Sequence, residues 1–291
     1  MTVAPIDKLV IVGVGLIGGS FALSLKQQQL VGRVVGIGRT RENLETALQR
    51  GIIDEATADY GVAAEAEVVF VATPVAQIPG VFAQLAPHLG ERTLITDGGS
   101  TKQEIIAAAR PMLGSHFSRF VPGHPIAGTE MSGAAAAFAT LFQHRKVVLT
   151  REAETDPKAV KRIGDLWRAC GADVRQMAAA RHDAIFAAVS HLPHVLAFGL
   201  VEDLAARPEA EDFFAFAASG FRDFTRIAGS DPEMWRDVCL ANRDALRAEL
   251  SRFRAQIDRV DAMIAHRDGD ALERLFAAAS EARRTWQASL E

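Results

Sequence analysis

A glycine-rich turn directly behind an apolar run constrains the fold of this chain more than any other feature. The run KLVIV occupies residues 8–12, and the turn GVGLIGG follows it, with a helical pattern from about residue 16 to residue 29. In this context Gly13 permits the tight turn, Gly15 lets the backbone approach a pyrophosphate, and Gly18 lets the helix pack closely on the strand. The phosphates would lie at the positive end of the helix. The sequence therefore predicts a dinucleotide site.

The first half of the chain alternates short apolar runs with helical patterns. This alternation indicates parallel βαβ units, and with the glycine turn it predicts an α/β fold whose N-terminal domain is of the Rossmann type. Expected strands occupy residues 8–12, 33–37, 67–72, 93–96, 119–121, 146–149 and 172–176, and a further helix occupies residues 41–50.

The pattern changes after Gln176. The β-branched runs stop, and long stretches rich in Ala, Leu, Arg and Glu follow, with apolar residues at helical spacing. Two long amphipathic helices are expected over residues 236–265 and 269–288. We therefore expect a dinucleotide-binding domain over residues 1–177 and an all-helical domain over residues 178–291.

Composition narrows the class of protein. Hydrophobic residues make up 49% of the chain and charged residues 23%, as in a globular protein with a core, and a formal net charge of −4 argues against nucleic-acid binding. Cys170 and Cys239 are far apart and lack metal-ligand spacing, so we expect free thiols in a reducing compartment and no metal site. No signal peptide and no uninterrupted apolar run of membrane-spanning length is evident, which predicts a cytoplasmic protein without a membrane segment.

The end of the second strand bears on the choice of dinucleotide. Sites specific for NAD usually carry an acid there, but this chain has Gly38, followed by Arg39, Thr40 and Arg41. A guanidinium beside a 2′-phosphate would contribute about 1.5–3 kcal/mol, so we expect NADP, with NAD still possible if Arg39 only stacks on its adenine. Further residues expected to contact the cofactor are Leu16 and Ile17 in the turn, and Thr73 and Pro74 after the third strand.

Several segments carry polar residues that a core would not need. They are TDGGSTK at 96–102, PGHPIAGTEMSG at 122–133, SHLPH at 190–194 and SGFRDFTRIAGSDPEMW at 219–235. His124 is expected in a loop, while His191 and His194 lie three apart and would share a helix face. Arg226 lies among apolar neighbours, so it requires an anionic partner, which is either a nearby aspartate or a substrate carboxylate.

Together these segments resemble the prephenate/arogenate (cyclohexadienyl) dehydrogenases of tyrosine biosynthesis. The resemblance spans residues 8 to about 240. It implies oxidative decarboxylation of prephenate or arogenate to 4-hydroxyphenylpyruvate or tyrosine, in a homodimer formed by the helical domain, with the active site between the two domains. The implied catalytic residues are His124, which would bind the 4-hydroxyl, and Ser100, which would orient it. The implied substrate-binding residues are Arg226 at a carboxylate, His194 with His191 as second choice, and Trp235 in the pocket wall.

Two other functions fit parts of the pattern. Another two-domain dehydrogenase, of the β-hydroxyacid type, would place a catalytic lysine in a glycine-rich helix of the second domain, and no such segment is evident. A non-catalytic dinucleotide-binding redox sensor would need none of His124, Ser100 and Arg226. Substrate choice and feedback inhibition by tyrosine do not follow from the sequence.

Overall fold

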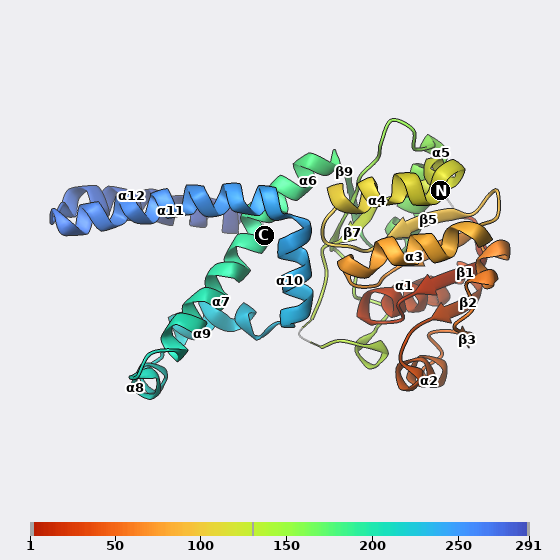
Figure 1. Ribbon diagram of the computed structural model, residues 1–291, viewed down its shortest axis with the longest axis horizontal. Coiled ribbons are helices and arrows are strands. Elements are labelled where there is room, and N and C mark those ends of the chain that lie inside the picture. The colour runs from red at the N-terminus through yellow and green to blue at the C-terminus, as the bar shows by residue number, and fades with distance from the viewer. Residues whose placement is uncertain (1–2, 130, 290–291) are drawn as a thin grey trace. The chain divides into compact units, whose positions relative to one another are not determined.

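The computed structural model describes residues 3–129 and 131–289 (Figure 1). The chain divides into two compact units, Met1–Arg243 and Asp244–Glu291. The domain boundary expected at residues 177 and 178 lies inside the first unit, between its last strand and the helices that follow, and it stays a prediction.

A six-stranded parallel sheet forms the centre of the first unit and confirms the predicted Rossmann-type fold. Its strand order is β3-β2-β1-β4-β5-β6. β2 and β3 lie on one side of β1, and β4, β5 and β6 lie on the other side. The strand order therefore reverses between β1 and β4, and in such sheets ligands bind at the carboxyl ends of the two strands where it reverses. The strands are β1 Ile6–Val12, β2 Val31–Ile37, β3 Glu55–Thr57, β4 Val68–Val71, β5 Leu94–Asp97 and β6 Phe120–Val121.

Helices cover both faces of this sheet, which explains why the strands read as continuous apolar runs. On one face the rings of Phe21, Phe70 and Trp167 pack together, with centroids 4.5–5.6 Å apart. On the other face Phe82 packs edge-on against Phe120 at 5.1 Å. The helices are α1 Leu16–Gln27, α2 Arg41–Gln49, α3 Ile78–Leu85, α4 Gln103–Leu113 and α5 Pro157–Ala169.

A smaller second sheet corrects one expectation about the site. It contains β7 Gly123–Pro125, β8 Lys146–Leu149 and β9 Asp173–Gln176, with β7 antiparallel to β8 and β8 parallel to β9. His124 was expected in a loop, but it lies in β7 opposite Val148. The expectation was wrong because three residues bounded by glycine and proline show no strand periodicity, and the pairing with β8 decides their conformation.

The helical part of the first unit begins with a long run that changes its pitch. α6 Ala179–Phe186 passes into a π-helical turn over Ala187–His191 and then into α7 Leu192–Ala205. Pro193 is the second residue after that turn and has no N–H for the carbonyl four residues earlier, so a wider turn lets later N–H donors bond to the carbonyls of this turn. Shorter helices follow: α8 Ala210–Ala215, α9 Ser219–Thr225 and α10 Pro232–Ala241.

The run Ala179–Ala205 is also long and apolar enough to cross a membrane, judged by length and composition alone. Its most apolar window has a mean hydropathy of 1.8 and is 17% buried. No membrane segment was expected, because the sequence has no uninterrupted apolar run of membrane-spanning length; this run meets the length and mean-hydropathy criterion although polar residues interrupt it. The run nevertheless carries His182 and Asp183, both buried in polar contacts with the first part of the chain.

Two long helices make up most of the second unit, α11 Arg243–Ala265 and α12 Gly269–Ala288. The single helix expected over residues 236–265 is instead α10 and α11, interrupted at Asn242 (φ −115°). Sequence periodicity missed this break because its cause is distant: the Asn242 amide donates to the main-chain oxygen of Asp183 at 2.8 Å.

Candidate active site

The glycine turn has the geometry that a dinucleotide phosphate requires. Gly13 has φ +95°, and a side chain there would lie 2.6 Å from the carbonyl oxygen of Ala72. A Cβ on Gly18 would lie 2.5 Å from the carbonyl oxygen of Gly13, so both positions exclude larger residues. A Cβ on Gly15 would meet nothing within 4 Å, and Gly15 caps α1 without a side-chain hydrogen bond. The helix N-terminus therefore faces open space suited to an anion.

The other candidate cofactor residues lie at the same carboxyl edge of the sheet. Thr73 and Pro74 directly follow β4, and Leu16 and Ile17 begin α1 half-buried. The hydroxyl oxygen of Thr73 is buried without a hydrogen-bond partner among the described residues. An orphaned hydroxyl beside an uncapped helix start fits a site that a polar ligand completes.

The two arginines that follow β2, Arg39 and Arg41, differ in their contacts. Arg39 and Thr40 are exposed, whereas Arg41 is engaged by Glu45, with Nε–Oε1 at 2.7 Å. A Cβ on Gly38 would already lie 3.0 Å from the Leu44 side chain. Residue 38 therefore has little room for a larger side chain and carries no carboxylate. The next residue, Arg39, has an exposed guanidinium.

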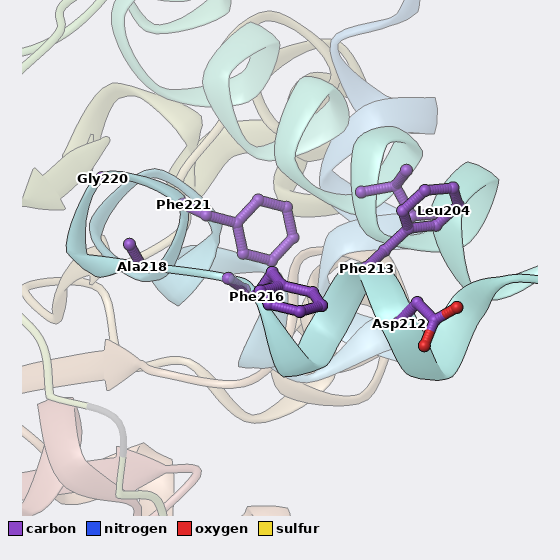
Figure 2. Close-up of a pocket in the computed structure, with 8 residues that line it drawn as sticks. Leu204, Asp212, Phe213, Phe216, Ala218, Gly220 and Phe221 are labelled. Carbon is purple, nitrogen blue, oxygen red and sulfur yellow. The ribbon is translucent and has the colours of Figure 1, made fainter.

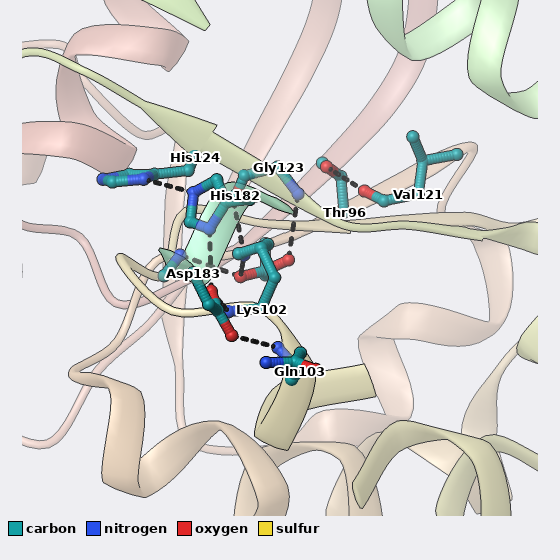
Figure 3. Close-up of polar contacts among 10 residues, drawn as sticks. Thr96, Lys102, Gln103, Val121, Gly123, His124, His182 and Asp183 are labelled. Atoms are coloured by element: carbon teal, nitrogen blue, oxygen red, sulfur yellow. Dashed lines mark hydrogen bonds and ion pairs between the residues drawn. The ribbon is translucent and has the colours of Figure 1, made fainter. Parts of the chain in front are cut away.

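A chain of hydrogen bonds runs from His124 to the start of α4 (Figure 3). His124 Nδ1 lies 2.8 Å from His182 Nε2, and His182 Nδ1 lies 2.8 Å from Asp183 Oδ1. The Asp183 carboxylate also accepts from the backbone N–H groups of Lys102 and Gln103, each at 2.8 Å. Asp183 thus caps α4 and holds His182 at the same time.

The protonation states in this chain fix which nitrogen of His124 is free. Hydrogen bonds from His182, Gln103 and Lys102 lower the pKa of Asp183 against the opposing effect of burial, so it is an acceptor only. Burial lowers the pKa of His182, and burial together with the charges of His182 and Lys102 lowers that of His124 well below its usual value. Both imidazoles are then neutral. His182 donates from Nδ1 to Asp183 and accepts at Nε2 from His124 Nδ1–H, which leaves His124 Nε2 as an unprotonated acceptor.

A buried ion pair lies beneath the strand that carries His124. Asp97 and Lys102 have fully buried side chains and contact one another, and Lys102 Nζ also donates to the Gly123 carbonyl at 2.6 Å. Asp97 accepts from Gly99 N at 2.8 Å and from Gly123 N at 3.1 Å. The pair therefore holds the residue before His124 and the residue before Ser100. Ser100 itself is half-buried.

A pocket of about 570 Å³ contains two of the predicted substrate-binding residues. His194 Nδ1 donates to the Ser190 carbonyl at 2.8 Å, which leaves Nε2 free to accept. Its ring stacks on Trp235 at a centroid distance of 3.5 Å and an interplanar angle of 20°. Burial and the charge of Arg226 lower the pKa of His194. The pocket is lined by Gly128, Thr129, Met131, His194, Arg226, Ile227 and Ser230.

His191 has a different environment from His194. It is 1% exposed, and its Nδ1 lies 3.0 Å from Asn242 Nδ2, which also donates to the Asp183 carbonyl. Burial lowers the pKa of His191 to about 4. It does not line the pocket, because the π-helical turn that ends at His191 separates the two histidines that the sequence placed on one helix face. His191 supports the backbone of Asp183 through Asn242.

The sequence by itself indicated no roles for His182 and Asp183, and it marked Asp97 and Lys102 only as members of the polar segment TDGGSTK. One signal was available, since adjacent His and Asp residues interrupt an otherwise apolar helix at RHDAIF. A buried polar pair in such a helix requires partners. The partners themselves could not be identified, because His124 lies 58 residues from His182.

A second pocket, of about 630 Å³, is apolar and lies among α7, α8 and α9 (Figure 2). The rings of Phe213, Phe216 and Phe221 form its walls, with Leu204 beside them and Asp212 at its edge. Phe216 is 88% exposed. Apolar surface of this kind marks an interaction surface rather than a site for polar chemistry.

Comparison with known proteins gives matches along most of the chain. The model of the prephenate dehydrogenase nucleotide-binding domain matches residues 21–176, and that of the prephenate dehydrogenase dimerization domain matches residues 178–278. The chain is 38% identical to prephenate dehydrogenase of Bacillus subtilis (strain 168), over 95% of this chain and 75% of the relative. It is 35% identical to cyclohexadienyl dehydrogenase of Zymomonas mobilis subsp. mobilis (strain ATCC 31821 / ZM4 / CP4), over 94% of each chain.

A solved structure is similar over nearly the same span. Prephenate dehydrogenase from Aquifex aeolicus, in complex with hydroxyphenyl propionate and NAD+, superposes with a TM-score of 0.88 at 36% identity. The match covers 94% of this chain and 96% of that one.

Proposed function

This chain belongs to the prephenate dehydrogenase family, and we propose that it uses the His124–His182–Asp183 chain to oxidise and decarboxylate prephenate or arogenate. The observation that carries this proposal is the free Nε2 of a neutral, half-buried His124 just before the segment that lines the Arg226 pocket. The bound cofactor, a nicotinamide dinucleotide, supplies the hydride acceptor.

His124 acts as the general base in this proposal. The substrate carries a hydroxyl and a hydrogen on C4 of a cyclohexadiene ring, and a carboxylate on the opposite ring carbon. His124 Nε2 accepts the hydroxyl proton while the C4 hydrogen leaves as hydride, and the carbon–carboxylate bond then breaks to release carbon dioxide. The electrons of that bond make the ring aromatic and end on the 4-oxygen, which takes a proton back from His124. Ser100 orients the hydroxyl.

The hydrogen-bonded chain behind His124 supports each of these proton movements. When His124 takes the proton it becomes a cation, and the His182–Asp183 pair stabilises it through the existing Nδ1–H hydrogen bond. Asp183 is held by two backbone N–H groups at the start of α4, so the chain stays oriented throughout. His182 and Asp183 are positioning residues, because they act through His124.

Arg226 and His194 bind and orient the substrate. A guanidinium can hold a carboxylate with two parallel hydrogen bonds, and the substrate has two carboxylates. His194 Nε2 is free on the same pocket wall, and Trp235 holds the His194 ring by stacking. The burial of His191 behind this wall supports His194 as the histidine that contacts substrate.

We propose NADP as the preferred dinucleotide, with NAD as a weaker substitute. Two neighbouring residues support this preference: Gly38 provides no carboxylate, and Arg39 after it has an exposed guanidinium. The relative from Aquifex aeolicus was solved with NAD+, so the proposed preference for NADP rests on this chain's own residues alone. The change Arg39→Ala should weaken NADP binding at least tenfold and NAD binding less than threefold, measured by titration. Equal losses for both would refute a contact with the 2′-phosphate.

The enzyme works in the cytoplasm as a homodimer in this proposal. The dimerization-domain match spans residues 178–278, and exposed apolar side chains lie along that stretch, including Val189 at 66%, Phe216 at 88% and Phe276 at 58%. A second copy of the chain would cover such side chains, including part of the apolar run Ala179–Ala205. Sedimentation of the purified protein tests this, since a monomer at micromolar concentration would contradict it.

The activity is tested directly by reduction of the dinucleotide at 340 nm. Each of prephenate and arogenate is combined with each of NADP and NAD, and carbon dioxide release is measured in parallel. We expect reduction with at least one substrate, faster with NADP, and one carbon dioxide for each dinucleotide reduced. No reduction in any of the four combinations would overturn the proposed function.

A further inference from the structure

One asparagine links the dinucleotide turn to the segment that lines the substrate pocket. The described residues 126–129 and 131–138 follow β7, and Gly128, Thr129 and Met131 in this segment form part of the pocket wall. The far end of the segment is held by side chains of α1, which begins at the dinucleotide turn, and of α2 with its C-terminal cap. The pocket wall is therefore anchored on elements of the cofactor site.

Asn43, in the first turn of α2, makes both halves of the link. Its Nδ2 donates to the carbonyl of Val14, inside the glycine turn, at 2.7 Å. Its Oδ1 accepts from the N–H of Ala134 at 2.8 Å. Gly133 has φ +81°, and a Cβ there would lie 3.1 Å from Asn43 Oδ1, so backbone and amide fit closely. One planar amide thus joins two backbones that are 120 residues apart in sequence, Val14 and Ala134.

Arg50, at the other end of α2, holds the same segment but does not touch the turn. Its guanidinium donates to the carbonyls of Ala134, Ala135 and Ala137, with the last two at 2.6 and 3.0 Å. Ser20 in α1 accepts from Phe138 N at 3.0 Å. These contacts anchor the segment whether or not the turn changes. Among the described residues, Asn43 alone has side-chain hydrogen bonds to both the turn and the segment.

We propose that Asn43 is a positioning residue that couples dinucleotide binding to substrate binding. This inference rests on the proposed function and assigns a residue within it. A dinucleotide bound on the glycine turn would hold the backbone of Val14, whose carbonyl bonds to Asn43, and would thereby fix the position of Asn43. Asn43 then fixes Ala134 and with it the pocket wall. By linkage, each ligand strengthens the binding of the other by the same factor.

The experiment measures that factor with a ligand that does not react. The dissociation constant of NADP is titrated with and without saturating hydroxyphenyl propionate, and the ratio of the two constants is the coupling factor. We expect a factor of at least about 5 in the unaltered protein, the lower end of typical coupling between sites. In Asn43→Ala the factor should fall below about 2, because the link between turn and pocket wall is gone.

Two matched variants separate coupling from general damage to the segment. Arg50→Leu removes three hydrogen bonds to the segment but none to the turn, so it should weaken hydroxyphenyl propionate binding with and without NADP and keep the factor. Thr46→Ala removes only a hydroxyl bond to the Glu42 carbonyl on the same helix and should change neither constant. Asn43→Ser provides a second test of the link if Asn43→Ala does not fold.

The results that would overturn the role of Asn43 differ from those that would overturn the proposed function. An unchanged factor in Asn43→Ala or Asn43→Ser, or a factor near 1 in the unaltered protein, overturns the role of Asn43. A loss of coupling in Arg50→Leu equal to that in Asn43→Ala also overturns it, because anchorage alone would then explain the effect. Failure of the unaltered protein to reduce any dinucleotide contradicts the proposed function instead.

Discussion

The change Asp183→Leu should inactivate the enzyme by reversing the direction of its hydrogen-bond chain. Asp183 accepts three hydrogen bonds at 2.8 Å, from Lys102 N and His182 Nδ1 at Oδ1 and from Gln103 N at Oδ2. A leucine accepts none, so a proton on His182 Nδ1 would be buried without an acceptor. His182 should then carry its proton on Nε2, where His124 Nδ1 can accept it. His124 in turn carries its own proton on Nε2 and presents an N–H, not a lone pair, to the substrate.

The magnitude follows from what a general base contributes. Loss of proton acceptance by His124 should lower kcat by roughly 10²–10⁴, or about 3–5 kcal/mol of activation free energy. The fold should survive, because the two backbone N–H groups of α4 that lose their acceptor cost about 1–3 kcal/mol each of the 5–15 kcal/mol typical of a domain. The dissociation constant of NADP should stay within about threefold, since none of the bonds touches the glycine turn.

The assay combines rate with two companion variants. Initial rates of dinucleotide reduction at 340 nm give kcat, and urea unfolding gives the stability of each variant. His182→Gln retains an oxygen that can accept from His124 Nδ1–H, so it should keep kcat within about tenfold, whereas His182→Leu should match Asp183→Leu. Asp165→Leu, on the surface of α5, is the control for an aspartate change. A kcat for Asp183→Leu within threefold of the unaltered enzyme would refute the role assigned to the chain.

Three further predictions follow from the same site. His124→Ala should lower kcat by roughly 10²–10⁴ with NADP binding unchanged, and a loss below tenfold would remove His124 from the mechanism. Arg226→Ala should chiefly raise KM, whereas unchanged KM and kcat would indicate a structural ion pair. Stability should fall in acid, because unfolded histidines bind protons below pH 6.5 while burial holds the pKa of His191 at about 4. That one residue should lower the free energy of unfolding by about 2 kcal/mol between pH 7 and pH 5, and His191→Gln should lessen this dependence. Equal unfolding free energies at the two pH values would contradict it.

The sequence alone determined the dinucleotide turn because all of its parts are local. The end of β1, the three glycines and the start of α1 lie within a dozen consecutive residues, and their spacing carries the geometry. The same holds for the apolar runs of the parallel sheet, since a strand buried on both faces has an apolar sequence whatever its neighbours are. The absence of an acid at Gly38 could likewise be read directly from the end of β2.

Only the tertiary structure decided how His124 is held. His124 lies in a strand because β8 pairs with it, and His182 reaches it across 58 residues of sequence. The break between α10 and α11 depends on Asn242, whose partners are 51 and 59 residues away. Hydrogen bonds between residues far apart in sequence leave no periodic pattern, because each of them needs only one suitable group at one point in space. Local sequence therefore predicts where a dinucleotide binds, and long-range packing determines which nitrogen of His124 is left free to accept a proton.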